Sequence, residues 1–527
     1  MNEETHPRSA ALARFFTGWW GALILVILLT VIVGCFVTGP YIATYRPLPF
    51  DTYRDIAYAR SLLLGRGIME DPTVEGARIW YPPLNPMFIA ALSKVTGERV
   101  DVLYALSPLF INLFVPLLFF LLVARWFGFR VGLASVFLLP VPLWLRTHLL
   151  TMGMPSVHSF VVVLAALGVF SLLIRRIQSP GTGLFLGLVG GLVMLHHSLS
   201  GLVYVGAIGL FLLWESIRLR SIPHFRGLVL FGVTAFIVSA PYTVPNALVP
   251  KLNPAPLAFV AQELKSLDFI LWLPNRWMFW LFWGLWLAGV VSLLAEKEKT
   301  SGMRLLLCVL VVSALGQVPG YLTFLPALQG RTMALVPHEF QWYFQLFSLV
   351  VVAVGWWRLL WSGGRWRKLA GVVALLLLCV PAWARVSADS KKYLVFYVEE
   401  PPRYTKWINE NIESDAVIVV SHPQIAYRYI QPQTARRIVH IYPPHMNFGV
   451  DVQKRGDLQY ELLFDAGKDR VDAIVRELGI DYIFLWRRNM PHERVLFFGD
   501  SYDVVYSDSE FDILRVDLSP REEETLQ

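Results

Sequence analysis

The sequence predicts a polytopic α-helical membrane protein followed by a soluble, extracytoplasmic α/β domain. The chain of 527 residues is 55% hydrophobic, above the roughly 45–50% apolar content of soluble domains. Many stretches of about 17–22 residues carry almost no charge, which is the length that the core of a bilayer requires. After Arg385 the composition changes to charged, amphipathic and β-rich segments, and no further spanning stretch follows.

Apolar windows predict about eleven transmembrane helices. The first window is too long for the core of a signal peptide, and no small-residue cleavage site follows it, so we expect a retained anchor. The windows lie near residues 16–38, 104–124, 131–148, 157–174, 182–197, 200–214, 227–245, 277–295, 305–325, 341–360 and 369–384.

Alternate loops differ in their content of lysine and arginine: one set carries roughly sixteen such residues and the other carries five, as the positive-inside rule describes. This asymmetry predicts a cytoplasmic N-terminus, and it places the loop 39–103 and everything after about residue 386 outside a cell membrane that is most consistent with a prokaryote. The net charge of +7 is dispersed among loops rather than gathered in a patch, which argues against a nucleic-acid partner. The outward set of loops, which has fewer basic residues, holds only Arg146, Lys251, Lys265, Arg276 and Arg331.

This pattern predicts that the chain is divided into two parts. Residues 1–385 form a membrane module whose first outer loop, 39–103, carries amphipathic helices, and residues 386–527 form the outer α/β domain. In the loop we expect a helix over 52–64, with Ile56, Ala59 and Leu63 on one face, and a short apolar segment over 86–92 that lies on the membrane surface. In the outer domain we expect helices over 403–412 and 468–478, strands over 415–420 and 481–485, and a hairpin over 504–516.

Two carboxylates one helical turn apart, Asp51 and Asp55, stand where the chain leaves the first span. A carboxylate there can act as a general base for an acceptor, or can hold a metal or an acceptor group at the membrane surface. Asp51 is equally suited to cap the helix that follows it. The two roles are compatible, because a capping position fixes the carboxylate at a helix entry.

The motifs around this pair resemble those of the GT-C superfamily, multi-spanning glycosyltransferases that use polyprenyl-phosphate-linked sugars. They are the apolar first span, Asp51 just beyond it, a helix ending in Leu-x-Gly, Asp71-Pro72, and Tyr81-Pro82-Pro83-Leu84-x-Pro86. The segment from Tyr404 to Asn411, followed by Asp415-Ala416-Val417-Ile418, is similar to the start of the terminal domain of many such proteins. The resemblance includes protein-O-mannosyltransferase-like, aminoarabinose-transferase-like and oligosaccharyltransferase-like members, and it leaves the subfamily unresolved. No Trp-Trp-Asp-like acceptor signature is present, which argues against a protein-N-glycosylating oligosaccharyltransferase.

The resemblance implies a reaction and a first set of residues. It makes Asp51 the catalytic base and Asp55 a weaker catalytic candidate, in an inverting displacement at the anomeric carbon that expels a polyprenyl phosphate or diphosphate. That leaving group is anionic and needs nearby cations. The donor-phosphate candidates are Arg331, which an interfacial anchor role explains equally well, and the pair His338 and Glu339.

Four further residues are candidates to line the site. Arg54 and Tyr81 lie in the first outer loop, where a solvated helix face is the alternative for the arginine. The adjacent His196 and His197 can bind one metal ion only if the helix has ended at that point, and a structural turn is the alternative. No metal is identified from the sequence, and a divalent cation such as Mg²⁺ or Mn²⁺ stays open.

The expected partners are a polyprenyl-phosphate-linked sugar donor, a glycan, lipid or protein acceptor, and membrane lipids. A lipid-linked-sugar transporter or flippase is an alternative function, but it predicts charges midway along spans or interrupted helices in paired halves. A non-catalytic membrane scaffold with a sensing domain is a second alternative. The sequence does not identify the sugar, the acceptor or the oligomeric state.

Overall fold

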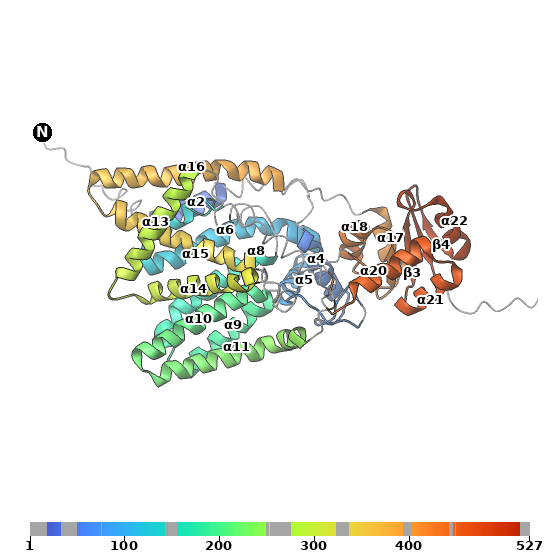
Figure 1. Ribbon diagram of the computed structural model, residues 1–527, viewed down its shortest axis with the longest axis horizontal. Coiled ribbons are helices and arrows are strands. Elements are labelled where there is room, and N and C mark those ends of the chain that lie inside the picture. The colour runs from blue at the N-terminus through green and yellow to red at the C-terminus, as the bar shows by residue number, and fades with distance from the viewer. Residues whose placement is uncertain are drawn as a thin grey trace, which may run out of the picture. The chain divides into compact units, whose positions relative to one another are not determined.

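The computed structural model describes residues 18–32, 50–74, 76–142, 145, 155–248, 252, 276–322, 337–393, 402–441, 446–447 and 449–516. The chain divides into two compact units, each described below by itself (Figure 1). The first unit holds Met1–Pro49, Tyr104–Pro241 and Val260–Tyr397, and the second holds Phe50–Leu103, Tyr242–Phe259 and Val398–Gln527.

The first unit is a bundle of apolar helices. Seven helices of the described chain are long and apolar enough to cross a membrane, and three shorter apolar helices accompany them. The seven are α8 (Pro155–Leu173), α10 (Ser198–Leu219), α11 (Ile222–Leu248), α13 (Arg276–Ala295), α14 (Ser301–Leu322), α15 (Pro337–Trp356) and α16 (Arg365–Tyr393). The shorter ones are α2 (Trp19–Ile32), the second half of α6 (Val100–Phe127) and α9 (Pro180–His196). Ten of the predicted windows therefore coincide with apolar helices, while the number of spans stays a prediction.

The window near 131–148 is described only in part, and its span stays a prediction. Its first part belongs to the nine-residue helix α7 (Phe129–Phe137), the chain then turns at residues 138–140, and residues 143–144 and 146–148 lie outside the described residues. Pro140 and Pro142 follow at once, and a proline lacks the N–H group that a helix interior needs. The window is apolar enough for a span, but apolarity alone does not keep the backbone helical.

Glycines let two helices of the bundle approach closely. A Cβ atom at Gly289 of α13 would lie 2.0 Å from the carbonyl oxygen of Val351, and one at Gly355 of α15 would lie 2.0 Å from that of Leu285. Any side chain at either position would push α13 and α15 apart. Small residues at such crossings are typical of membrane bundles, where van der Waals packing holds helices together.

The second unit is built on a five-stranded mixed sheet in the order β2-β1-β3-β5-β4. β1 pairs in parallel with β2 and β3, while β5 is antiparallel to both β3 and β4. The strands are β1 (Val417–Val420), β2 (Arg437–Ile438), β3 (Tyr482–Trp486), β4 (Asp503–Ser507) and β5 (Phe511–Arg515). The predicted strands at 415–420 and 481–485 and the hairpin at 504–516 are thus present.

Helices cover both faces of this sheet. One face packs on α17 (Arg403–Asn411), α18 (Pro423–Ile425) and the π-helix η7 (Ala426–Ile430). The other packs on α20 (Val452–Tyr460), the π-helix η9 (Glu461–Asp465), α21 (Lys468–Leu478) and α22 (His492–Ser501). Consecutive strand residues alternate between the two cores, Ile418 with Val420 on one side and Val417 with Val419 on the other. The remaining helix, α19 (Gln431–Thr434), contacts α17 and the first outer loop.

Residues 50–103 of the predicted first outer loop belong to this second unit. They contain α4 (Phe50–Leu63) and α5 (Leu84–Thr96), which contact each other, and α4 also contacts η7 and α19. Ile56 and Ala59 are buried as predicted, but Leu63 is 43% exposed, and Arg54 and Asp55 are buried as well. The predicted amphipathic helix is therefore buried on more than one face, because α5 and the C-terminal helices cover it.

Candidate active site

The first turn of α4 carries the residue that the sequence places at the centre of the site. Asp51 is the second residue of this helix, and its side chain lies outside the described part of the structure. Asp55, one turn later, has no exposed surface and accepts a hydrogen bond from Nε of Arg54 over 3.0 Å. The two carboxylates of the predicted pair therefore share one helix, and the second of them is ion-paired.

Arg54 connects α4 to the segment that precedes α5. Its guanidinium carbon lies 3.5 Å from the ring centroid of Tyr81 and 5.3 Å from that of Trp80. Arg54 is 5% exposed, so both the cation–π contacts and the ion pair with Asp55 are shielded from water, which strengthens them. The structure thus brings together three predicted residues, namely Arg54, Asp55 and Tyr81.

A second buried carboxylate, Asp71, organises the loop between α4 and α5. Its Oδ1 accepts hydrogen bonds from the backbone N–H groups of Thr73 at 2.7 Å and Val74 at 3.3 Å. Its Oδ2 accepts from Nδ2 of Asn447 at 2.9 Å and from the hydroxyl of Tyr58 at 3.5 Å. Burial raises the pKa of Asp71 although these hydrogen bonds act in the opposite direction.

Asn447 fastens this loop to the C-terminal part of the chain. Besides Asp71, its amide donates to the carbonyl oxygen of Arg78 over 2.7 Å. A backbone hydrogen bond also joins the loop to the sheet, since the N–H group of Ile438 in β2 donates to the carbonyl oxygen of Thr73 over 3.1 Å. Arg437 forms an ion pair with Glu70 at 2.9 Å. The sequence analysis noted Asp71 only as part of a motif and missed Asn447, since no local pattern links residues 376 positions apart.

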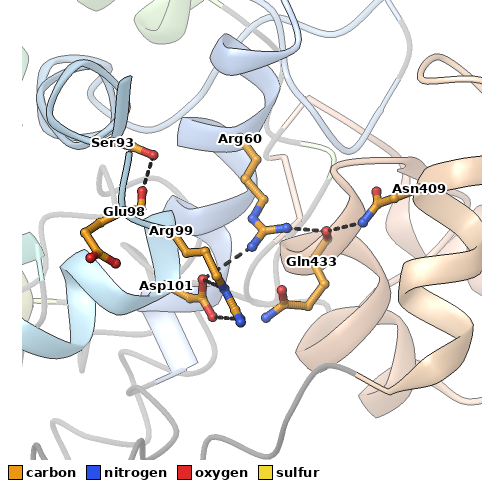
Figure 2. A network of polar contacts seen from close by, with 7 residues as sticks. All are labelled: Arg60, Ser93, Glu98, Arg99, Asp101, Asn409 and Gln433. Atoms are coloured by element: carbon orange, nitrogen blue, oxygen red, sulfur yellow. Dashed lines mark hydrogen bonds and ion pairs between the residues drawn. The ribbon is translucent and has the colours of Figure 1, made fainter. Parts of the chain in front are cut away.

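A third polar network joins α4 to α19, as Figure 2 shows. Arg60 donates from Nη1 to the carbonyl oxygen of Gln433 and pairs through Nη2 with Asp101 at 3.3 Å. Asn409 of α17 donates to the same carbonyl oxygen over 3.1 Å, and Arg99 also pairs with Asp101. The carbonyl lies in the last turn of α19, where backbone acceptors have no partner within the helix.

The predicted histidines lie in the first unit. α9 ends at His196, and His197 has extended backbone, so the helix ends where the metal hypothesis required. Nδ1 of His197 lies 2.8 Å from the hydroxyl of Ser200, which lies 2.7 Å from that of Ser159. The chain of hydrogen bonds continues from Ser159 to the hydroxyl of Tyr343 over 3.1 Å. His197 thus caps α10 and starts a buried polar chain across three helices, which the sequence did not predict.

Three donor-phosphate candidates remain predictions. Arg331 lies outside the described residues, and His338 and Glu339 occupy the first turn of α15 with side chains that are not described. Within the described ranges, no group of three or more His, Cys, Asp or Glu side chains could hold a metal ion.

Part of the chain matches a known family. Residues 81–244, which begin at Tyr81, match the family model described as dolichyl-phosphate-mannose-protein mannosyltransferase. No curated protein sequence gives a significant match.

The fold resembles that of a solved archaeal enzyme. The oligosaccharyltransferase of Archaeoglobus fulgidus, tethered to an acceptor peptide with the NVT sequon, superposes with a TM-score of 0.58 at 13% identity, over 90% of this chain and 70% of that one. The same organism's AglB, in complex with an inhibitory peptide and a dolichol-phosphate, superposes with a TM-score of 0.56 at 12% identity, over 89% of this chain and 70% of that one. ArnT from Cupriavidus metallidurans, bound to undecaprenyl phosphate, aligns over 94% of this chain and 98% of that one at 13% identity, with a lower TM-score of 0.47. The fold likeness and the family match together confirm the resemblance to the GT-C superfamily of membrane glycosyltransferases, with the subfamily unresolved.

Proposed function

We propose that the chain transfers a sugar from a polyprenyl-phosphate-linked donor to an acceptor on the extracytoplasmic face of the membrane. The observation that carries the proposal is the start of α4, where Asp51 stands one turn before a buried and ion-paired Asp55. A carboxylate on a helix that is fixed at several points is held in the way that general-base catalysis needs. A negative charge in the first turn of a helix is also favoured by the helix dipole.

In the proposed reaction Asp51 takes the proton from an acceptor hydroxyl. The freed oxygen attacks the anomeric carbon and forms the new glycosidic bond, while the bond from that carbon to the phosphate oxygen breaks. The electron pair leaves with the polyprenyl phosphate or diphosphate. A single displacement of this kind inverts the anomeric configuration, and cations near the leaving group lower its barrier. Arg331 and His338, with Glu339, are the proposed groups for that region.

Asp55 and Arg54 act in this proposal as positioning residues. Arg54 bonds to Asp55 and stacks on Tyr81 at the same time. It therefore fixes the segment Trp80–Tyr81 against the helix that carries Asp51. His197 and its hydrogen-bonded partners are assigned no step.

The nature of the donor rests on what the related proteins contain. One structure of the archaeal AglB holds dolichol-phosphate, and the matching family model is described by a dolichyl-phosphate sugar. These parallels support a polyprenyl-linked donor for this chain. The acceptor stays a glycan, a lipid or a protein.

A divalent metal has no assigned step. One structure of the archaeal enzyme is described as a complex with Zn and sulfate. Among the described residues of this chain, no group of three or more His, Cys, Asp or Glu side chains could hold a metal ion, and the proposed reaction uses protein groups alone. A chelator arm in the assay tests Mg²⁺ or Mn²⁺ dependence directly.

The test is a transfer assay in proteoliposomes with a panel of polyprenyl-phosphate and polyprenyl-diphosphate sugars, with and without chelator. Asp51→Asn should lower the rate about 10²- to 10⁴-fold, the usual contribution of a general base. Asp55→Asn should lower it less. Glu98→Gln removes an exposed carboxylate of the same loop and is the matched control, expected within about twofold of the wild type.

Full activity of a folded Asp51→Asn protein would overturn the assignment of the base. Movement of the lipid-linked sugar between leaflets without any transfer would support the flippase instead. A protein that neither transfers nor translocates any donor of the panel would favour the alternative function, a non-catalytic membrane scaffold.

A further inference from the structure

The first unit contains a cavity at the basic end of its membrane helices, and none of the candidate site residues lines it. It has a volume of about 460 Å³ and is lined by α6, α8, the 3-10 turn η3 (Ile174–Arg176) that follows α8, and the start of α14. Arg125 and Arg175 contribute the charge, and Ser171, Thr300 and Ser301 contribute hydroxyl groups. No carboxylate is among its lining residues, which makes the cavity cationic.

Among the described residues, no carboxylate compensates the charge on the two arginines. Arg125 donates from Nη2 to the carbonyl oxygen of Ser171 over 3.1 Å, which positions the side chain without neutralising it. Within the described part of the chain, no ion pair joins Arg125 or Arg175 to a carboxylate. The nearby Arg304 differs, because its Nε lies 2.5 Å from Glu215, a buried carboxylate that also pairs with Arg218.

The wall of the cavity is fixed by direct contacts. Nε1 of Trp126 donates to the hydroxyl of Ser171 over 3.0 Å and ties α6 to α8. On the α14 side, a Cβ atom at Gly302 would lie 2.7 Å from Trp126, so the start of α14 packs directly against this ring. The cavity therefore has a defined shape, and its size is within the range of about 300–1,000 Å³ that is usual for ligand sites.

A second cavity, of about 230 Å³, shares Trp126 with the first. Its lining is mainly apolar and includes Phe127, Leu293 and Trp357. Its arginine, Arg358, pairs with Glu296 at 2.9 Å. A cationic cavity next to an apolar one matches a molecule that combines an anionic head with hydrocarbon. The positive-inside distribution places this end of the helices in the cytoplasm, where the leaflet contains anionic lipids.

We infer that the cavity of Arg125 and Arg175 binds the phosphate group of an anionic phospholipid from the cytoplasmic leaflet. The arginines pair with the phosphate oxygens, the three hydroxyl side chains supply further hydrogen bonds, and the acyl chains lie along the apolar surface beyond Trp126. The same phosphate chemistry could come from a soluble phosphate. The inference is independent of the proposed transfer reaction, because it involves none of the residues assigned to that reaction.

The experiment is native mass spectrometry of the full chain, delipidated in detergent and titrated with phosphatidylglycerol or phosphatidylcholine. A basic residue near a membrane surface favours an anionic lipid by about fivefold. We therefore expect Arg125→Gln/Arg175→Gln to weaken phosphatidylglycerol binding about 10- to 30-fold and to weaken phosphatidylcholine binding less, because the choline cation of that lipid already offsets its phosphate charge. The matched control, Arg176→Gln/Arg226→Gln, removes two exposed arginines that do not line the cavity and should change binding less than about threefold.

A competition arm identifies the source of the phosphate. If millimolar glycerol 1-phosphate displaces phosphatidylglycerol, the cavity takes the phosphate group alone; if it does not, the lipid is required. Arg125→Lys/Arg175→Lys keeps both charges and should retain most of the lipid preference, which separates a binding effect from a folding effect. Equal losses in the cavity variant and its control, or equal affinity for the two lipids in the wild type, would overturn the inference.

Discussion

At the scale of single residues, the candidate site is a set of buried charges with different tasks. Asp55 is paired with Arg54, and Arg54 is shared between that carboxylate and two aromatic rings. Breaking a buried pair on one side leaves the other charge without compensation, at a cost of about 3–5 kcal/mol. Arg54 is therefore a structural requirement of the site as well as a charge, and lysine, which lacks the planar guanidinium, is a poor replacement.

Asp71 gives a prediction about pH. Burial raises its pKa above the usual 3.8, so the folded state prefers the protonated acid. Its contribution to stability is then largest below about pH 4 and is lost as the pH rises through the pKa of the folded state. Asparagine at this position does not titrate. The melting temperature of the wild type minus that of Asp71→Asn should therefore fall between pH 4 and pH 8 in thermal-unfolding measurements.

The comparison with the variant removes the titration of the other groups, which both proteins share. Tyr58 faces Asp71 but does not ionise in this range, since burial and then the Asp71 carboxylate raise its pKa well above the usual value. A difference that stays constant or grows with pH would contradict the assignment of a raised pKa to Asp71.

At the scale of elements, the junction of α4, α17 and α19 depends on Arg60. Arg60 supplies a partner to the Gln433 carbonyl oxygen and to the buried Asp101. Arg60→Met keeps the aliphatic stem and removes both interactions, so we expect a loss of about 1–3 kcal/mol of local stability. Asn409→Ala should cost less, because the same carbonyl keeps its bond from Arg60. The measurement is limited proteolysis of the segment between α4 and α5.

Lys406→Met is the matched control for this junction. It removes a cation of the same unit whose partner, Glu410, lies one turn away on an exposed helix face. Such a pair contributes about 0.3–0.5 kcal/mol. If Arg60→Met is cleaved no faster than Lys406→Met, the junction does not hold the loop in place.

At the scale of the whole molecule, the sequence predicts local features well and distant contacts poorly. Ten apolar windows coincide with helices because apolar content over about twenty residues is a local property. In the window near 131–148, which is described only in part, α7 ends at Phe137 inside an apolar stretch, just before Pro140 and Pro142. The position of Asp51 at a helix start was also predictable, because the loop motif is contiguous.

The partners of the loop could not be predicted in this way. Arg60 and Gln433 are 373 residues apart, and Asp71 and Asn447 are 376 apart, and no periodicity connects them. The sequence therefore groups the loop 39–103 with the membrane module, whereas the contacts of its described part group it with the C-terminal part of the chain. Only an unfolding experiment decides which grouping describes cooperative stability.

Hydrogen exchange on the full chain provides that experiment. Ile408 of α17 is fully buried in the core that also includes Val74 of the loop, and Ile408→Ala should cost about 2–5 kcal/mol. If the loop belongs to the second unit, the amides of α4 should lose protection together with those of β1 and β3, while α10 and α14 keep theirs. The reciprocal variant, Leu306→Ala, empties a fully buried position of α14 and should loosen α10 and α15 but not α4. Loss of α4 protection with Leu306→Ala alone would show that the loop is stabilised by the membrane helices, and that the helix of Asp51 unfolds with them.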